Sequence, residues 1–315
     1  MKINELLLSS DQTVCIVGHV HPDGDCLGSQ TAVYRYLEEN CPGLQLTLYT
    51  KDVLPNLEFL MEGIDWKEDD GEDVIYDLAI SVDASRLDRI PAGLTAFNKA
   101  KRRVCIDHHE TNYGFGNFNI IEGNASSTAE VLMGLMEDEK ISAKTAISLY
   151  TGIVHDTGVF RYPCTSPETL RKAAKLVEKG IPFSKIIENS FVNMRHKEMC
   201  IMGRVMSEAV LIPEESFKYS FASREMQEEF DVLPVDLGAI VSRLNETDEA
   251  EVILFLYQNL DGTWKGSLRS RCDVNVAKIA ETFGGGGHEK SAGFSLENDP
   301  EKAVEKVREL IKAQK

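Results

Sequence analysis

The sequence predicts an α/β fold in two domains: a doubly wound, mostly parallel sheet in the N-terminal domain and a smaller α/β domain at the C-terminus. Short apolar runs alternate with helical periods over the first part of the chain, which is typical of βαβ units. The length of 315 residues exceeds that of one ordinary domain. We place the first domain at 1–185, a helical linker at 186–214 and the second domain at 215–315.

In the first domain, apolar runs predict strands at 13–17, 44–49, 77–82 and 103–106. Apolar residues at helical spacing predict helices at 27–39, 57–61, 129–137, 143–154 and 167–179, after the end of a short leading helix at 6–10. Residues 94–100 precede the strand that ends in the acidic and histidine triplet at 107–109. Ser142 is expected to cap one of these helices, and Gly158 to terminate it.

One or two helices are expected over 184–210. Beyond them, the sequence predicts strands at 217–223, 251–258 and 263–269 and helices at 235–244 and 274–282. The turn residues 259–262 should join the last two strands as a hairpin.

Composition limits the classes of function. With 34 basic and 51 acidic residues, the net charge of −17 disfavours binding to long nucleic acid, duplex DNA included. Seven scattered cysteines without a CxxC pair indicate free thiols in a reducing cytoplasm. No apolar run approaches the ~18 residues that span a bilayer, and the first residues are too short and acidic for a secretory signal, so we expect a cytoplasmic protein without membrane association.

Ionisable side chains follow three of the predicted strands. These residues are His19, Asp23 and Asp25 after the first strand, Asp83 after the third, and Asp107, His108 and His109 after the fourth. Asp156 ends a helix. Since the carboxyl ends of strands in an open parallel sheet share one crevice, we expect these side chains to meet. Taken alone, each could be a solvated loop residue or a helix cap, and only their convergence favours a site.

Histidine mixed with carboxylate suits borderline divalent ions, and oxygen-rich sites favour manganese. Two ions ~3.5–4 Å apart need a shared carboxylate and can activate a water between them. This chemistry suits hydrolysis at phosphorus. No cysteine lies in a zinc pattern, and no P-loop motif is present.

The second domain carries a glycine run, 284–287, followed by His288. The run could be a flexible turn, and Arg269 and Arg271 could be solvated surface residues. Together they favour a phosphate clamp, because glycines allow close backbone approach and both arginines would share one face of a strand.

The motifs His19-x-x-x-Asp23-x-Asp25, Asp83, Asp107-His108-His109 and Asp156-Thr157-Gly158 resemble those of the DHH phosphoesterases. The glycine run and Ser291-Ala292-Gly293-Phe294 resemble the signature of the DHH-associated C-terminal domain. The resemblance covers nearly the whole chain and is strongest to the bacterial branch that contains nano-RNases and phosphatases of 3′-phosphoadenosine-5′-phosphate (pAp). Cys26 departs from the small alanine that is usual after the second acid.

The resemblance implies a role for each matching residue. One manganese ion would be held by His19, Asp23 and Asp83, and the other by Asp25, Asp83, His108 and Asp156. Asp107 would orient the motif, and His109 would contact the substrate phosphate or protonate the leaving oxygen. The nucleotide would be gripped from the second domain by Arg269, Arg271, Gly285, Gly286 and His288, with the active site in the cleft between the domains.

We therefore expect a phosphoesterase with two Mn²⁺ ions that hydrolyses short RNA or DNA oligonucleotides and converts pAp to AMP; a homodimer is compatible with this expectation. Alternatives within the enzyme class are a phosphodiesterase for cyclic di-AMP or its linear dinucleotide, a single-strand exonuclease, and a polyphosphatase or pyrophosphatase. The alternative outside that class is a nucleotide-binding regulator without turnover.

Overall fold

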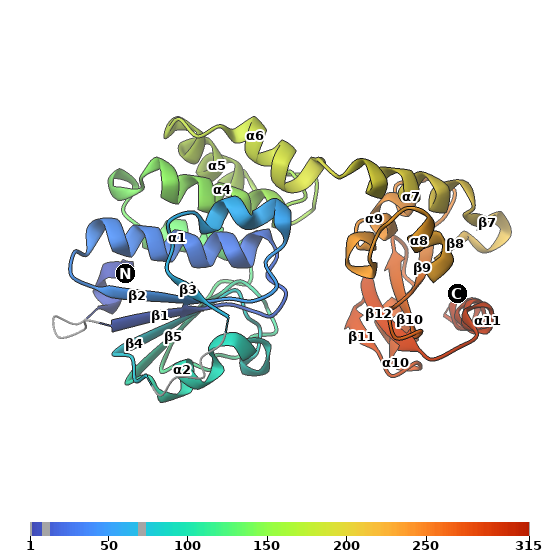
Figure 1. Ribbon diagram of the computed structural model, residues 1–315, viewed down its shortest axis with the longest axis horizontal. Coiled ribbons are helices and arrows are strands. Elements are labelled where there is room, and N and C mark those ends of the chain that lie inside the picture. The colour runs from blue at the N-terminus through green and yellow to red at the C-terminus, as the bar shows by residue number, and fades with distance from the viewer. Residues whose placement is uncertain (1, 8–12, 69–73, 315) are drawn as a thin grey trace. The chain divides into compact units, whose positions relative to one another are not determined.

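The computed structural model describes residues 2–7, 13–68 and 74–314 (Figure 1). The chain divides into two compact units, Met1–Asn193 and Met194–Lys315. Each has its own hydrophobic core. Among the residues described, no helix is both long and apolar enough to cross a membrane.

The first unit is built on a six-stranded sheet in which every pairing is parallel. Its strands are β1 (Thr13–Val17), β2 (Gln45–Tyr49), β3 (Trp66–Lys67), β4 (Leu78–Val82), β5 (Arg102–Asp107) and β6 (Phe118–Ile121), in the order β3-β2-β1-β4-β5-β6. The predicted parallel α/β sheet is thus confirmed. From β1, the chain adds β2 and β3 on one side of the sheet and then β4, β5 and β6 on the other side. The boundary between β1 and β4 is therefore the topological switch point, where such sheets bind ligands.

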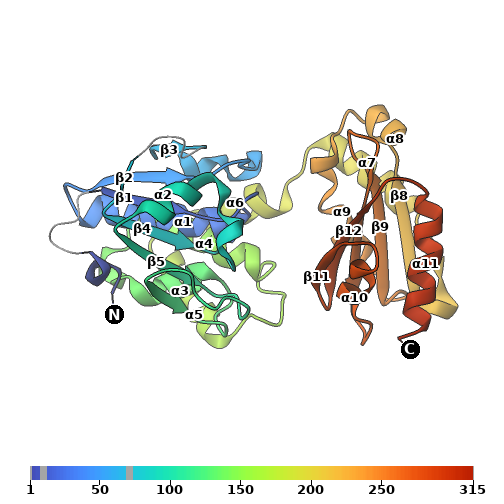
Figure 2. The same ribbon diagram turned by 90° about the horizontal axis from the view of Figure 1, so that it is seen from below.

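Helices cover both faces of this sheet (Figure 2). They are α1 (Gly24–Asn40), α2 (Leu94–Lys99), α3 (Thr128–Leu135), α4 (Ala143–Asp156), α5 (Pro167–Glu178) and α6 (Phe183–Ile187). Alternation along β1 assigns the faces: Val14 and Ile16 pack in the core that includes residues of α1, α3 and α4, whereas Cys15 and Val17 pack with α2. Short 3₁₀ turns connect the elements: η1 (Ile3–Leu6), η2 (Pro55–Met61), η3 (Leu87–Arg89), η4 (Pro91–Gly93) and η5 (Asp138–Lys140).

A close approach of α1 to α4 depends on two glycines. A Cβ on Gly28 would lie 2.5 Å from the carbonyl oxygen of Ser148, and a Cβ on Gly152 would lie 2.6 Å from the Oδ1 of Asp25. Neither contact is sterically allowed. The two glycines therefore let α1, which carries Asp25, lie directly against α4, which ends at Asp156.

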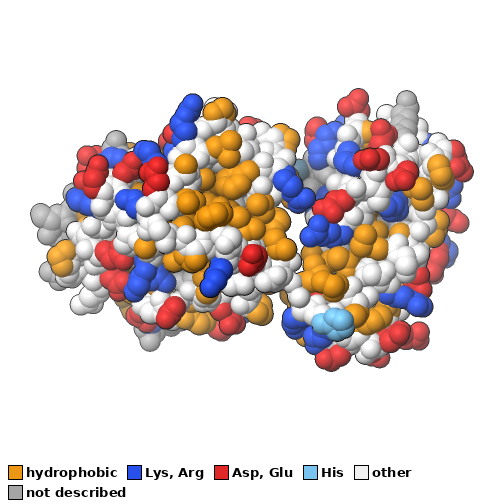
Figure 3. All heavy atoms as spheres, turned by 90° about the horizontal axis from the view of Figure 1, so that it is seen from above, with side chains coloured by type: hydrophobic (Ala, Val, Ile, Leu, Met, Phe, Trp, Pro, Cys, Tyr) orange, Lys and Arg blue, Asp and Glu red, His pale blue; other side chains and the backbone are white. Residues whose placement is uncertain are grey.

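A π-helix, η6 (Glu188–Val192), follows α6 near the end of the first unit. Phe183 and Val192 of these two elements are exposed hydrophobic residues, as is Phe59 of η2. Figure 3 shows hydrophobic side chains gathered on the face of the unit that carries α6.

The second unit has a mixed six-stranded sheet in the order β11-β12-β10-β9-β8-β7, in which β8 and β9 are parallel and the other pairs antiparallel. Its strands are β7 (Val210–Ile212), β8 (Phe217–Ala222), β9 (Val252–Gln258), β10 (Trp264–Ser270), β11 (Gly286–His288) and β12 (Ser291–Leu296). Its helices are α7 (His196–Ser207), α8 (Arg224–Glu229), α9 (Ile240–Leu244), α10 (Val276–Glu281) and α11 (Pro300–Lys312), with 3₁₀ turns η7 (Pro213–Glu215) and η8 (Pro234–Leu237). The predicted β9–β10 hairpin is confirmed.

Several predicted boundaries were wrong. The helix expected over 235–244 is two pieces, η8 and α9, separated by Gly238 and Ala239. Helix α1 begins at Gly24, three residues early, because the Asp23 side chain caps it. The expected end of a leading helix at 6–10 falls mostly outside the described residues, and η1 ends at Leu6.

We predict that Gly28→Ala destabilises the protein by about 1–3 kcal/mol, because the added methyl group overpacks the α1–α4 contact. The matched control is Gly134→Ala in α3, where a Cβ meets nothing within 4 Å and helix propensity should raise stability by up to ~1 kcal/mol. Urea unfolding followed by circular dichroism measures both. Equal stability of the two variants would contradict the close-packing argument.

Candidate metal centre

Asp83 lies at the switch point, directly after β4 and almost fully buried. Its φ of +52° is in the left-handed region, which aspartate tolerates better than most residues. The neighbouring elements fix this conformation: the Asp83 N–H donates to the carbonyl of Ile106 on β5 at 3.1 Å, and the Thr128 hydroxyl of α3 donates to its Oδ1 at 2.9 Å. The carboxylate is therefore held rigidly.

The two oxygens of Asp83 face two different histidines. Oδ2 lies 3.4 Å from Nε2 of His19, and Oδ1 lies 3.7 Å from Nε2 of His108. A carboxylate placed in this way can bridge two ions.

Both histidines are oriented as metal-binding histidines usually are. Nδ1 of His19 lies 2.9 Å from the carbonyl of Val20, and Nδ1 of His108 lies 3.3 Å from the carbonyl of Ala125. A carbonyl only accepts, so each Nδ1 carries a proton, and Nε2 is the ring atom that faces the carboxylates and would bind a metal ion.

Asp25 and Asp156 complete the second half of the cluster. Asp25, His108 and Asp156 each offer a ligand atom within 4.8 Å of the others, and Asp156 Oδ2 lies 3.0 Å from His108 Nε2. The buried Asp25 carboxylate accepts from the backbone N–H groups of Thr128 and Ala129 at 2.7 and 3.0 Å. These groups belong to the N-terminus of α3, whose dipole favours a negative charge.

Asp23 is placed differently from the other acids. Its Oδ1 accepts from the N–H groups of Asp25 and Cys26, both at 3.0 Å, and lies 3.8 Å from Nε2 of His19. One oxygen therefore caps α1. Among the residues that the structure describes, His19, Cys26 and Asp83 offer potential ligand atoms within 4.8 Å of one another, and no such group includes Asp23.

Asp107, the last residue of β5, is fully buried and orients the neighbouring histidines. Its Oδ1 accepts from the backbone N–H of His108 and from Nδ1 of His109, both at 2.8 Å, and its Oδ2 accepts from the Asn112 amide at 2.6 Å. This hydrogen bond with Asp107 raises the pKa of His109. The His109 side chain stays 34% exposed, so it can reach a bound molecule.

The cluster is short of positive charge. Burial raises the pKa of Asp25, and repulsion from Asp83 and Asp156 raises it further. Burial and the charge of Asp83 raise the pKa of Asp156 to about 6. Burial opposes protonation of His108, yet the carboxylates of Asp156, Asp25 and Asp83 raise its pKa to about 10. Divalent cations would relieve this repulsion, and the mixed imidazole and carboxylate donors fit them.

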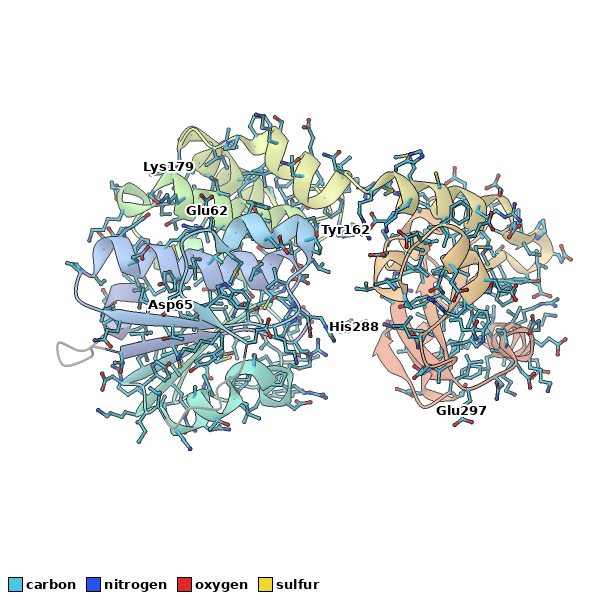
Figure 4. The ribbon with its side chains drawn as sticks, in the orientation of Figure 1. Glu62, Asp65, Tyr162, Lys179, His288 and Glu297 are labelled. Carbon is cyan, nitrogen blue, oxygen red and sulfur yellow. The ribbon has the colours of Figure 1, made fainter. Side chains whose placement is uncertain are left out.

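The predicted clamp residues all lie in the second unit. Arg271 directly follows the end of β10, and its backbone N–H donates to the Glu251 carbonyl at 2.8 Å, which continues the β9–β10 register. Its guanidinium donates to the carbonyls of Thr247 and Ala250. Arg269 is partly buried in β10 and donates to the Leu268 carbonyl at 2.9 Å. His288 is exposed and ends β11 (Figure 4).

At three of the four positions in the glycine run, the backbone conformation or a close contact explains why the residue is glycine. Gly284 and Gly287 have positive φ, and a Cβ on Gly285 would lie 2.2 Å from the Gly293 carbonyl of β12. Gly286 has ordinary φ and open space around it. The local fold does not require a glycine at this position, which is consistent with close approach of a ligand.

The site also includes Thr128 and Asn112, for which the sequence pattern gives no signal. Thr128 directly precedes the helix predicted at 129–137, and its contact with Asp83 joins positions 45 apart in the chain. Asn112 lies five residues after Asp107, but a polar residue in a loop gave no signal of its burial.

Comparison with protein-family models finds two matching domains. The DHH family N-terminal domain matches residues 13–153, and the DHHA1 domain matches residues 215–314.

A bifunctional oligoribonuclease and PAP phosphatase, NrnA, from Thermus thermophilus is 29% identical over 98% of this chain and 92% of its own length. An uncharacterized protein, MG371, from Mycoplasma genitalium is 30% identical over 89% of this chain and 85% of its own length. The crystal structure of an exopolyphosphatase-related protein from Bacteroides fragilis shares the fold, with a TM-score of 0.87 at 24% identity over 96% of this chain and 92% of that one.

The two domain matches, the relatives that span nearly the whole chain and the cluster at the sheet's switch point lead to one conclusion: the chain belongs to the DHH family of phosphoesterases and is a hydrolase of phosphoester bonds.

Proposed function

We propose that the protein is a manganese-dependent phosphoesterase that hydrolyses short oligonucleotides and converts pAp to AMP. The observation that carries the proposal is the position of Asp83, whose two oxygens face His19 and His108. The NrnA relative from Thermus thermophilus, named as an oligoribonuclease and PAP phosphatase, supports the choice of substrate. A homodimer and a cytoplasmic location stay predictions.

In this proposal one ion would be held by His19, Asp23 and Asp83, and the other by Asp25, Asp83, His108 and Asp156. When bound, two divalent ions supply a water activated at neutral pH and neutralise the phosphoryl oxygens. The fit of Asp25 and Asp156 to a cation is supported by the raised pKa of each carboxyl group.

The protein's own proton donor would be His109. Its Nδ1 is committed to Asp107, which leaves Nε2 for the substrate. Asp107 stabilises the charged imidazolium, so the ring can donate a proton to the leaving oxygen and recover it from solvent. Asn112 keeps Asp107 in place by holding its other oxygen.

We further propose that the second unit binds the nucleotide through Arg269, Arg271, Gly285, Gly286 and His288. Phosphate takes charge-assisted hydrogen bonds from guanidinium groups. The open space around Gly286 supports close contact of a ligand with the backbone.

The broad test is a manganese-supplemented screen of pAp, dinucleotides, longer RNA, cyclic di-AMP, pyrophosphate and polyphosphate. Turnover of pAp and dinucleotides is expected. Turnover confined to cyclic di-AMP or to polyphosphate would replace the proposal by that alternative, and nucleotide binding without turnover of any substrate would favour the regulator.

We predict that Asp83→Asn lowers kcat at least about 10²-fold and reduces bound manganese, because the bridging charge is lost. Asparagine keeps the size of the side chain and tolerates the left-handed φ, so the fold should persist. Activity assays and metal analysis of the purified protein measure the two effects. Asp88→Asn, at an exposed residue five positions later, should change neither. Normal turnover by a folded Asp83→Asn protein would refute the two-metal centre.

For the second unit, Arg271→Ala should raise KM for pAp about tenfold or more, the effect of losing one charge-assisted hydrogen bond. Manganese content should stay unchanged. Thermal unfolding has to accompany the kinetics, because Arg271 also donates to the Thr247 and Ala250 carbonyls. Arg243→Ala, which removes an arginine paired with Glu246 on the same unit, is the control. Loss of metal, or an unchanged KM, would remove Arg271 from the substrate site.

Substrate length provides a separate prediction. A protein of net charge −17 gains little from counterion release along a polymer, so affinity should come from a terminal phosphate and the nearest bases. Oligonucleotides of about two to five residues should be cleaved faster than RNA of about 20, with a shallow dependence on salt. Time courses on a length series at two salt concentrations measure this. Faster cleavage of the long strand, lost steeply on adding salt, would indicate a long-strand exonuclease.

A further inference from the structure

The thiol of Cys26 lies beside the proposed metal centre and has no part in the function proposed above. Cys26 is on the first turn of α1 and is fully buried. Its Sγ accepts from the backbone N–H of His19 at 3.2 Å. Gly18 makes room for the sulfur, since a Cβ there would lie 2.5 Å from Sγ.

The sulfur shares its surroundings with two of the proposed ligands. His19, Cys26 and Asp83 each offer a donor atom, and these atoms all lie within 4.8 Å of one another. They come from three different segments, and the orientation of the His19 ring already directs Nε2 towards Asp83. Small side-chain adjustments would bring one nitrogen, one sulfur and one oxygen onto a single ion, which is a donor set suited to tetrahedral zinc.

We propose that Cys26 is a further ligand of the ion at His19 and Asp83, so that this position binds thiophilic divalent cations such as Zn²⁺ or Cd²⁺ more tightly than it would without the thiolate, while it still accepts Mn²⁺. Thiolate is a soft donor that favours such ions, whereas manganese prefers carboxylate and water. On binding, the sulfur–hydrogen bond breaks, the proton passes to solvent, and a sulfur–metal bond forms without change of oxidation state. The inference rests on the proposed metal centre but can fail independently of it.

A second thiol near the centre offers a matched control. Cys164 is exposed, and its Sγ lies 3.6 Å from the backbone carbonyl of Asp156. Among the residues that the structure describes, Cys164 belongs to no set of three potential metal ligands whose donor atoms lie within 4.8 Å of one another. A sulfur signal that is lost in Cys26→Ala but kept in Cys164→Ala would therefore be assigned to Cys26.

The experiment is a titration of chelator-treated full-length protein with Co²⁺, followed by absorption spectroscopy. Wild type and Cys164→Ala should both show a near-ultraviolet sulfur-to-cobalt charge-transfer band, and Cys26→Ala should lack it while keeping the visible bands of bound cobalt. Zn²⁺ affinity of Cys26→Ala should fall at least about tenfold, whereas Mn²⁺ affinity should change by less than about threefold.

Cadmium NMR of the wild-type protein keeps the proposal testable if Cys26→Ala fails to fold. A thiolate ligand moves the cadmium resonance far from the range of nitrogen and oxygen sites. A resonance in that nitrogen and oxygen range, or a charge-transfer band that disappears in Cys164→Ala instead, would overturn the proposal. If the wild-type protein binds cobalt and shows the visible bands but no sulfur-to-cobalt charge-transfer band, the metal centre is supported and Cys26 is excluded as a ligand. Absence of bound cobalt would refute both the metal centre and the cysteine ligand.

Discussion

The site depends on holding mutually repelling carboxylates together inside the protein. Asp25 and Asp83 are almost fully buried, and Asp156 lies beside them. Burying such charges is costly unless other groups compensate. Compensation within the chain comes from hydrogen bonds: the N-terminal N–H groups of α3 bind Asp25, and the Thr128 hydroxyl binds Asp83. The repulsion that remains is what makes the cluster attractive to divalent cations.

Packing of the first unit follows from the same requirement. Asp25 is near the start of α1 and Asp156 is at the end of α4, so the two helices must approach closely for their carboxylates to share a site. Gly28 and Gly152 permit this approach because any Cβ would overlap the opposite helix or Asp25 itself. The left-handed backbone conformation of Asp83 also costs conformational free energy. Hydrogen bonds from Asp83 to β5 and from Thr128 of α3 to Asp83 hold the residue in this conformation.

In the second unit, the local fold requires only part of the glycine run. Three of the four residues in the run 284–287 are explained by backbone conformation or by contact with β12, and Gly286 is not. A glycine-rich motif therefore need not be functional throughout. Arg271 illustrates the same point, because its guanidinium already bonds to backbone carbonyls of its own unit.

The sequence by itself determined the parallel α/β architecture and the positions of the acids and histidines at strand ends. These features are local: apolar periodicity marks the strands, and polar residues after a buried strand stand out. Only the tertiary structure decided which atoms meet. It placed Thr128 on Asp83, Asn112 on Asp107 and the Cys26 sulfur beside His19. Such contacts depend on how α1, α3 and the loop after β5 pack on the sheet, and a sequence pattern carries no direct record of distances between segments that are remote in the chain.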